Sequence, residues 1–172
     1  MQSCITIQTT LKARCRAIPH LIHPHDVLAY ARAGLMHAPG RHSNAVEAIA
    51  CHLRSLRLTY IPDRKGSDSW YIPLATLRRG GGDCDDHSIL TASFLRAVGA
   101  RADVILGWLR KPGRRGYHAW VAGVAPCGRC RFVLEPQNGR IWWNETPPDR
   151  DAEYRIAPEG CSRVDRHLRP LA

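Results

Sequence analysis

The chain has 172 residues, of which 44% are hydrophobic and 23% are charged, and its formal net charge at pH 7 is +10. These proportions exclude wholesale disorder, and the length predicts a single domain with its own core. No apolar run approaches the ~20 residues that span a bilayer, so we expect no membrane partner. Arginine supplies most of the positive charge, which we expect to attract nucleic acid only non-specifically.

Seven cysteines are scattered along the chain. Their odd number and wide spacing do not resemble a disulfide framework, so a reducing compartment is expected. The first ten residues lack the charged start and the long apolar middle of a secretory signal. We therefore expect a cytoplasmic protein.

The N-terminal part of the chain predicts a strand followed by two helices. Residues 2–10 alternate in part and predict a short strand. Residues 25–33 predict one or two helical turns that end at Gly34. Ser43 is a suitable N-cap for the next helix, which has an apolar stripe formed by Val46, Ile49, Ala50, Leu53 and Leu56.

Residues 80–87, Gly-Gly-Gly-Asp-Cys-Asp-Asp-His, precede a segment with helical periodicity that ends at Gly99. The glycines allow the backbone to turn sharply and to approach another group closely. Cys84 is thus expected at the N-terminus of a helix, a position that lowers the pKa of a thiol and favours the thiolate. The alternative is a buried cysteine that acts only as a small hydrophobic residue.

Beyond Gly99 the pattern becomes extended, and the predicted strands cover residues 103–109, 117–124, 131–135 and 140–143. Asn138-Gly139 is a strong hairpin signal, and residues 111–116 form a basic turn. From residue 144 the chain is rich in Pro, Arg and Asp, and we expect it to wrap the surface, with residues 154–156 as an edge strand. Helices followed by an antiparallel meander predict an α+β fold.

A nucleophilic cysteine needs a base, usually histidine, and a group that orients the base. If the hairpin between residues 117–124 and 131–135 turns symmetrically about Pro126 and Cys127, His118 lies directly opposite Glu135. Trp120 would share the face of His118. The alternative is a histidine that Glu135 satisfies for structural reasons only.

Four segments together resemble the bacterial transglutaminase-like cysteine peptidases, which belong to the transglutaminase-like superfamily and have a papain-like core. These segments are residues 68–73 (Asp-Ser-Trp-Tyr-Ile-Pro), 81–86 (Gly-Gly-Asp-Cys-Asp-Asp), 117–121 (Tyr-His-Ala-Trp-Val) and 134–136 (Leu-Glu-Pro). The resemblance covers about residues 43–143. It implies one domain over residues 1–172, with an N-terminal extension over 1–42 and a C-terminal surface tail over 144–172.

By this resemblance Cys84 is the nucleophile, His118 the general base and acid, and Glu135 the third member, where the family more often has Asp. Trp70, Asp83 and Trp120 are further candidates for substrate binding or the oxyanion site.

The implied activity is acyl transfer from a peptide or side-chain amide bond of a protein or peptide substrate, through a thioester. The enzyme would be a thiol peptidase, an amidase or a transglutaminase. The backbone N–H of Cys84 would help to hold the oxyanion. The alternative is a catalytically silent binding module of a phage or surface assembly, which the basic turn at residues 111–115 would suit.

No metal or other cofactor is expected. We expect Asp83, Asp85 and Asp86 to point away from the thiol, capping the helix or pairing with arginines, and their spacing with His87 fits no calcium loop. A looser N-terminal cluster, interrupted by two prolines, consists of His20, His23, His25 and Asp26. A zinc site from Cys127, Cys130, Cys161 and a histidine lacks a second pair at ligand spacing.

Overall fold

The computed structural model describes residues 4–6, 15–38 and 44–171. The predicted strand over residues 2–10 is seen at Cys4–Thr6, and the rest of that range lies outside the described residues, as does Ser43. None of the helices in the described ranges has the length and apolarity that crossing a membrane requires.

The helical elements precede most of the strands along the chain. The helices are η1 (Ile18–Leu21), η2 (His25–Val27), α2 (Leu28–His37), α3 (Ala45–Ser55), α4 (Pro73–Arg79) and α5 (Cys84–Ala97). The strands are β1 (Cys4–Thr6), β2 (Thr59–Tyr60), β3 (Ser69–Tyr71), β4 (Gly81–Gly82), β5 (Arg101–Lys111), β6 (Arg114–Val124), β7 (Arg131–Glu135), β8 (Arg140–Trp143), β9 (Arg150–Ala157) and β10 (Gly160–Arg163).

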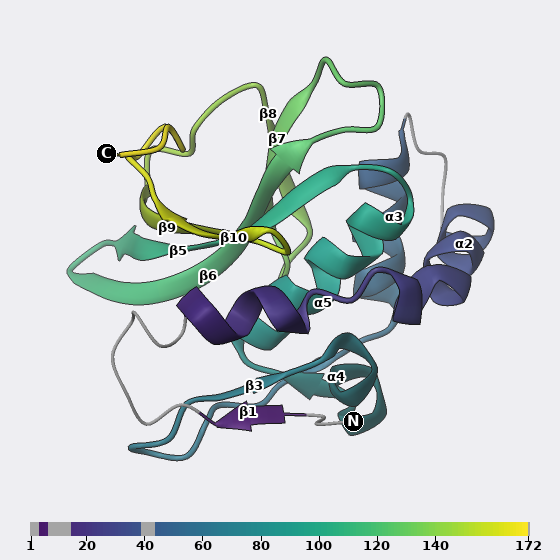
Figure 1. Ribbon diagram of the computed structural model, residues 1–172, viewed down its shortest axis with the longest axis horizontal. Coiled ribbons are helices and arrows are strands. Elements are labelled where there is room, and N and C mark those ends of the chain that lie inside the picture. Colours follow the sequence, from purple (N-terminus) through teal and green to yellow (C-terminus); the bar gives the residue numbers. More distant parts are fainter. Residues whose placement is uncertain (1–3, 7–14, 39–43, 172) are drawn as a thin grey trace.

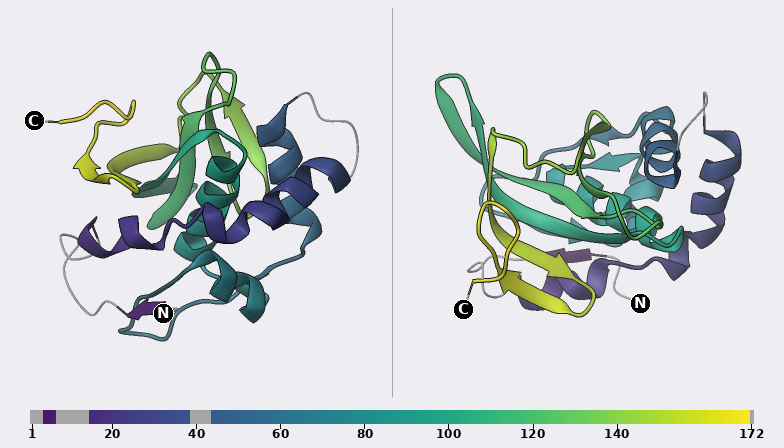
Figure 2. Two further views of the ribbon diagram at one scale, coloured as in Figure 1. Left: turned by 45° about the vertical axis from the view of Figure 1, so that its right-hand side comes forward. Right: turned by 90° about the horizontal axis from the view of Figure 1, so that it is seen from above.

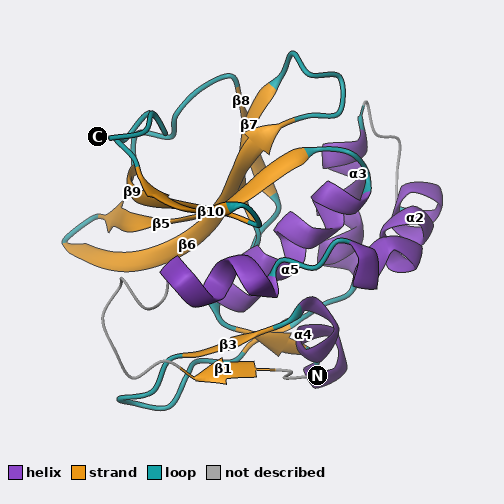
Figure 3. Cartoon of the chain, viewed as in Figure 1, coloured by secondary structure: helices purple, strands orange, loops and turns teal. Residues whose placement is uncertain are grey.

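The main sheet is antiparallel and has the strand order β10-β9-β5-β6-β7-β8. Helix α5 lies between this sheet and the layer formed by α4, β1 and β3 (Figures 1 and 3). The β5–β6 hairpin extends past the body of the fold (Figure 2, right). This is the α+β architecture that the sequence predicts.

Helix α5 carries the central part of the core. All of its side chains from residue 85 to residue 95 are buried, because it contacts strands on one side and helices on the others. An amphipathic surface helix would have one apolar and one charged face, whereas α5 is apolar or small on all sides from residue 88 to residue 95. The cysteine at its first position is therefore held by a rigid element.

The two N-terminal helix predictions differ in outcome. Asn44 caps α3 and accepts hydrogen bonds from the backbone N–H groups of Val46 (3.0 Å) and Glu47 (3.1 Å). The stripe on α3 is buried as predicted except for Leu56, which lies beyond the helix and is 38% exposed. The predicted stop at Gly34 is wrong: α2 continues to residue 37, and Gly34 instead allows α2 to pack closely on His52 of α3.

The prediction for the C-terminal tail is also wrong. Strand β9 lies inside the sheet, between β5 and β10, and the edge strand is β10. The polar composition of residues 150–157 conceals this strand, because several of its charged side chains form ion pairs within the fold. A segment expected to wrap the surface thus supplies a residue of the candidate site, as described below.

One cysteine pair contradicts the expectation that the chain lacks disulfides. Cys15 and Cys161 form a disulfide with a Cα–Cα distance of 5.2 Å, which ties the start of the N-terminal helical segment to β10. Cys51, Cys84, Cys127 and Cys130 are not part of a disulfide.

The predicted close approach at the glycine run is confirmed. Gly81 pairs with Thr59 in the short parallel β2–β4 ladder, and a side chain there would overlap the Thr59 backbone. A side chain on Gly82 would overlap the Asp86 carboxylate. Asp86 in turn accepts a hydrogen bond from the Tyr71 backbone N–H (2.8 Å), so the glycines allow the loop before Cys84 to be pinned to β3.

Gly82→Ala should lower the free energy of unfolding by about 1–3 kcal/mol, because the added methyl group overlaps the Asp86 carboxylate. Urea unfolding measures this change. Gly116→Ala is the matched control, since a methyl group on Gly116 meets nothing within 4 Å. Equal unfolding midpoints for the two variants would contradict the assigned role of Gly82.

Candidate active site

Cys84 occupies the first position of α5, and its side chain is mostly buried. Asp83 is the N-cap and accepts a hydrogen bond from the Asp85 backbone N–H (3.1 Å). The backbone of Ala119 in β6 is close enough to Cys84 to lower the pKa of its thiol. The thiol therefore faces the strand segment that carries His118.

His118 is hydrogen-bonded to Glu135, with 2.9 Å between Nε2 and Oε2. Both side chains are largely buried, at 11% and 6% exposure. The ring of His118 stacks on Trp120, with 6.3 Å between ring centroids and an interplanar angle of 29°. The carboxylate thus fixes one ring nitrogen, while Trp120 fixes the plane of the imidazole.

The strand register that produces this pair differs from the predicted one by two residues. Val121 pairs with Leu134, and the ladder continues to an Ala125–Cys130 hydrogen bond of 2.8 Å at the turn. Extended by one residue, this register places Trp120 opposite Glu135 and makes His118 its diagonal neighbour. A shift of two residues keeps every side chain on its predicted face, so the imidazole and the carboxylate still meet.

No sequence pattern points to Arg150 as a residue of the site. Its Nη1 donates to the same Oε2 of Glu135 at 2.8 Å, and its side chain is 6% exposed. The guanidinium also lies over the rings of Trp142 (4.9 Å) and Trp120 (5.5 Å). Strand β9 places Arg150 here, and the sequence predicted only residues 154–156 of that strand, at the edge of the sheet.

These neighbours decide the charge of Glu135. Burial alone would raise the pKa of the carboxyl group. The hydrogen bond from His118, the charge of that ring and the charge of Arg150 outweigh burial and bring the pKa below its usual range. Glu135 is therefore ionised at neutral pH.

The expectation of a lowered thiol pKa is wrong. Burial is the largest effect on Cys84 and the charge of Asp83 the second, and together they raise the pKa of the thiol to about 12. The hydrogen bond from Ala119 and the backbone of Cys84 itself act in the opposite direction but are weaker. Cys84 consequently carries its proton at rest.

The three aspartates beside the thiol only partly follow the prediction. Asp83 caps the helix, and Asp86 lies 3.6 Å from the Arg79 guanidinium. Asp85 instead is buried, and its Oδ1 has no hydrogen-bond partner. Burial raises the pKa of Asp85 well above its usual value and that of Asp86 to about 7. One ligand oxygen from each of these three residues lies within 4.8 Å of the others.

A cleft of about 680 Å³ opens beside His118 and Glu135. Its walls come from β2, the β5–β6 hairpin, the segment around β7 and β8, and the start of β9. The lining residues are Tyr60, Leu109, Lys111, Arg114, Arg115, Gly116, Tyr117, His118, Glu135, Gln137, Asn138, Arg140, Trp142, Asp149 and Arg150. Tyr60 is 53% exposed. The pKa of its phenol is raised, with burial as the largest cause and the nearby Cys84 as the second.

The two tryptophans proposed from the sequence lie outside this lining. Trp70 is 1% exposed, packs in the main core and donates from Nε1 to Asp68 (2.8 Å). Trp120 is 2% exposed and supports the His118 ring from within the sheet.

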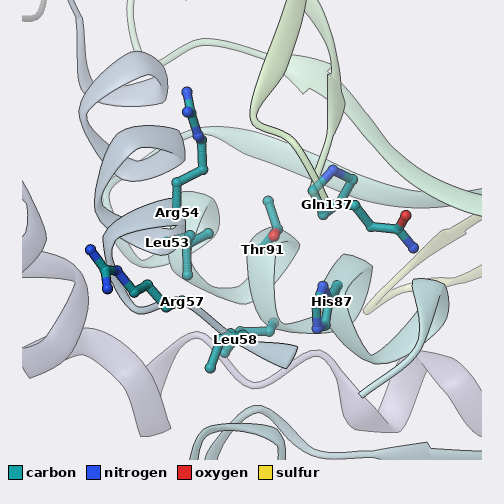
Figure 4. A pocket seen from close by; sticks show the side chains of 9 residues that line it. Leu53, Arg54, Arg57, Leu58, His87, Thr91 and Gln137 are labelled. Atoms are coloured by element: carbon teal, nitrogen blue, oxygen red, sulfur yellow. The ribbon is translucent and has the colours of Figure 1, made fainter. Parts of the chain in front are cut away.

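A smaller cavity of about 220 Å³ lies next to the cleft, and Gln137 lines both. His87, one turn after Cys84, has its Nε2 buried there without a partner, and burial lowers the pKa of the ring. Figure 4 shows the guanidinium groups of Arg54 and Arg57 pointing away from His87.

Two metal sites were considered from the sequence, a cysteine set and an N-terminal histidine cluster. Cys161 is in the disulfide, so it cannot join Cys127 and Cys130. His23 pairs with Asp26 (3.0 Å). Among the described residues, the aspartates at 83, 85 and 86 form the single group with metal-ligand spacing.

Comparison with known proteins assigns the family. The model of the transglutaminase-like superfamily matches residues 31–144, so the chain belongs to this superfamily, and the resemblance drawn from the sequence is confirmed. A sequence search finds no match among curated proteins.

Two solved structures share the fold. Legionella pneumophila LapG has 18% identity and a TM-score of 0.52 over 82% of this chain and 87% of its own, and its calcium-bound form gives 0.53. A Cytophaga hutchinsonii protein described as a candidate cysteine protease has 12% identity and a TM-score of 0.53, over 98% of this chain and 66% of its own.

Glu135→Gln should destabilise the protein at pH 7 by about 3 kcal/mol, because it leaves the Arg150 charge buried without its partner. The pKa of Glu135 is lower in the folded protein than in the unfolded chain. The ionised carboxylate therefore contributes fully to stability above its pKa in the unfolded chain, and this contribution is lost as the pH falls through its pKa in the folded protein. The difference between wild type and variant in urea unfolding should therefore shrink below pH 4.

Glu159→Gln is the matched control, since Glu159 is 75% exposed. A difference for Glu135→Gln that stays constant from pH 3 to pH 7 would contradict the ionised pair.

Proposed function

We propose that the chain is a cysteine-dependent acyl transferase, a thiol peptidase or amidase, in which Cys84, His118 and Glu135 act on a protein or peptide substrate. One observation carries the proposal. The backbone of Ala119 is close enough to Cys84 to lower the pKa of its thiol, and the preceding residue, His118, carries an imidazole that a buried, ionised carboxylate holds. A nucleophile, a base and an orienting acid on three separate elements match the geometry that covalent catalysis requires.

The raised pKa of the thiol bears on the first step of the proposed reaction. Because Cys84 is protonated at rest, His118 has to accept the thiol proton as the sulfur attacks the carbonyl carbon. The C–S bond forms, and the C–N bond breaks when the imidazolium returns that proton to the leaving amine. Water then attacks the thioester carbonyl while His118 takes a proton from it. The C–S bond breaks, and His118 returns the proton to the sulfur, which releases the carboxylic acid and the free thiol.

Glu135 supports both proton transfers. It binds Nε2 of His118, so Nδ1 is the nitrogen that exchanges the proton with the thiol. The imidazolium that forms is stabilised by the carboxylate, which Arg150 keeps ionised. The backbone N–H of Cys84, at the positive end of α5, is the donor we assign to the oxyanion.

An acceptor amine in place of water would give transamidation by the same residues. The rival proposal is a silent binding module, which the high pKa of the Cys84 thiol would suit. The two differ in whether any product depends on the sulfur.

Incubation with a proteome-derived peptide library, with methylamine present, tests the proposal. Mass spectrometry should detect new peptide termini, or methylamine adducts, that Cys84→Ala abolishes. His118→Ala should lower the rate by at least about 100-fold, because the thiol then loses its base. Cys51→Ala, which changes a cysteine of α3 that is outside the disulfide, is the control that should retain activity. If no product depends on Cys84, the silent module is correct.

We further propose that the three aspartates bind a divalent cation such as calcium. Oxygen ligands of this charge suit calcium, and the buried, unpartnered Oδ1 of Asp85 is an oxygen that a cation would satisfy. The comparison structure of calcium-bound LapG motivates the choice of ion. The ion would supply positive charge beside the carboxylates that raise the pKa of Cys84.

Calcium chloride should raise the unfolding temperature of the wild type by several degrees, and EGTA should reverse the rise. Asp85→Asn should remove the effect without loss of the fold, because the high pKa of Asp85 makes asparagine a close substitute for the protonated acid. Asp151→Asn, in β9, should respond like the wild type. An equal rise in all three proteins would show that calcium acts elsewhere.

A further inference from the structure

The cleft beside His118 has an uneven distribution of charge. Five of its lining side chains are cationic and two are carboxylates. Both carboxylates contact one and the same arginine: Glu135 binds Arg150 at 2.8 Å, and Asp149 lies 3.5 Å from its Nε. Arg150 therefore adds no net positive charge to the cleft, because two carboxylates face its guanidinium.

The other four cations have no carboxylate partner among the described residues. They are Lys111, Arg114, Arg115 and Arg140, and all four are exposed. Three come from the tip of the β5–β6 hairpin and the fourth from the start of β8. Neighbouring arginines on the same strands do form such pairs, since Arg110 lies 3.4 Å from Asp151. An excess of positive charge thus lies at the hairpin side of the cleft.

Two of these cations are held in place by aromatic rings. The guanidinium of Arg115 lies 4.3 Å from the centre of the Trp108 ring, and that of Arg140 lies 4.6 Å from the Trp142 ring. Stacking on a ring restricts the guanidinium but uses none of its N–H donors in the ring plane. The donors therefore stay available for a bidentate bond to a carboxylate.

Tyr60 of β2 also lines the cleft, and burial, followed by the charges of Cys84 and Asp83, raises the pKa of its phenol. Asp83 itself lies outside the lining, so it does not offset the excess of positive charge on the hairpin side of the cleft. Electrostatic complementarity at this side favours a ligand of the opposite charge.

We propose that the substrate is an acidic peptide or protein segment, whose carboxylates lie against the hairpin side of the cleft when the scissile bond lies at Cys84. This substrate class rests on the proposed function for its catalytic part, but the binding part does not need a reactive thiol. Attraction across exposed cations should weaken with salt.

Binding is tested first, with the Cys84→Ala variant of the full chain. A fluorescein-labelled glutamate-rich Gly-Ser peptide and its glutamine counterpart are compared by anisotropy. The acidic peptide should bind about tenfold more tightly at low salt, and the preference should fade as sodium chloride is added. Equal affinity for the two peptides, or tighter binding of a single-stranded oligonucleotide, would overturn the proposal.

The matched variants have the same change in net charge. Arg114→Glu with Arg115→Glu should abolish the preference for the acidic peptide, whereas Arg101→Glu with Arg131→Glu should retain it, since those two arginines line a separate cavity. If both double variants lose the preference alike, the binding is a property of total charge and the cleft assignment is wrong.

Cleavage supplies the second readout. With active protein, kcat/KM for library-derived substrates should fall when glutamates are replaced by glutamine, and the hairpin variant should lose this discrimination. Cys84-dependent cleavage with equal rates for both peptides would overturn the substrate class and leave the proposed function intact. Selective binding without cleavage would overturn the proposed function and retain the acidic-ligand site.

Discussion

The carboxylate of Glu135 joins three strands through one oxygen atom. Its Oε2 accepts from His118 of β6 and from Arg150 of β9, while Glu135 itself ends β7. Because His118 is a diagonal neighbour in the register, the carboxylate has to span more than a directly opposed pair would require. Glutamate, one methylene longer than aspartate, provides the reach for this diagonal contact.

The reactivity of the thiol is decided by two effects of unequal size. The N-terminus of a helix contributes up to about 2 kcal/mol, or between one and two pKa units. Burial of an ionisable group can shift a pKa by about 3–5 units, and around Cys84 it acts together with the charge of Asp83. Burial therefore prevails over the helix dipole. The mechanism proposed above therefore forms the nucleophile by proton transfer to His118 during the reaction rather than from a standing thiolate.

The repeat of apolar residues along helices and strands explains which features could be predicted from the sequence. Helical spacing located α5, and alternation located β5 to β8, because each depends on neighbours in the chain. The predicted strand register was wrong by two residues, but His118 and Glu135 still meet because side chains on one face of a strand recur every two residues. Arg150 and the burial of Trp70 depend instead on strand β9 and on packing between distant segments. The Cys15–Cys161 disulfide depends on such long-range packing too, and so does the pKa of Cys84.

For the cleft, the positions of the arginines matter more than the net charge of the chain. Several arginines of the described residues are used inside the fold, as in the pairs of Arg96 with Asp103 and of Arg150 with Glu135. Arg114 and Arg115, at the tip of the β5–β6 hairpin, have no carboxylate partner among the described residues, because the hairpin extends beyond the body of the fold (Figure 2). The same extension raises one wall of the cleft above His118. Strands β5 and β6, each eleven residues long, extend past the core. This extension forms one wall of the cleft and carries the positive charge of that wall.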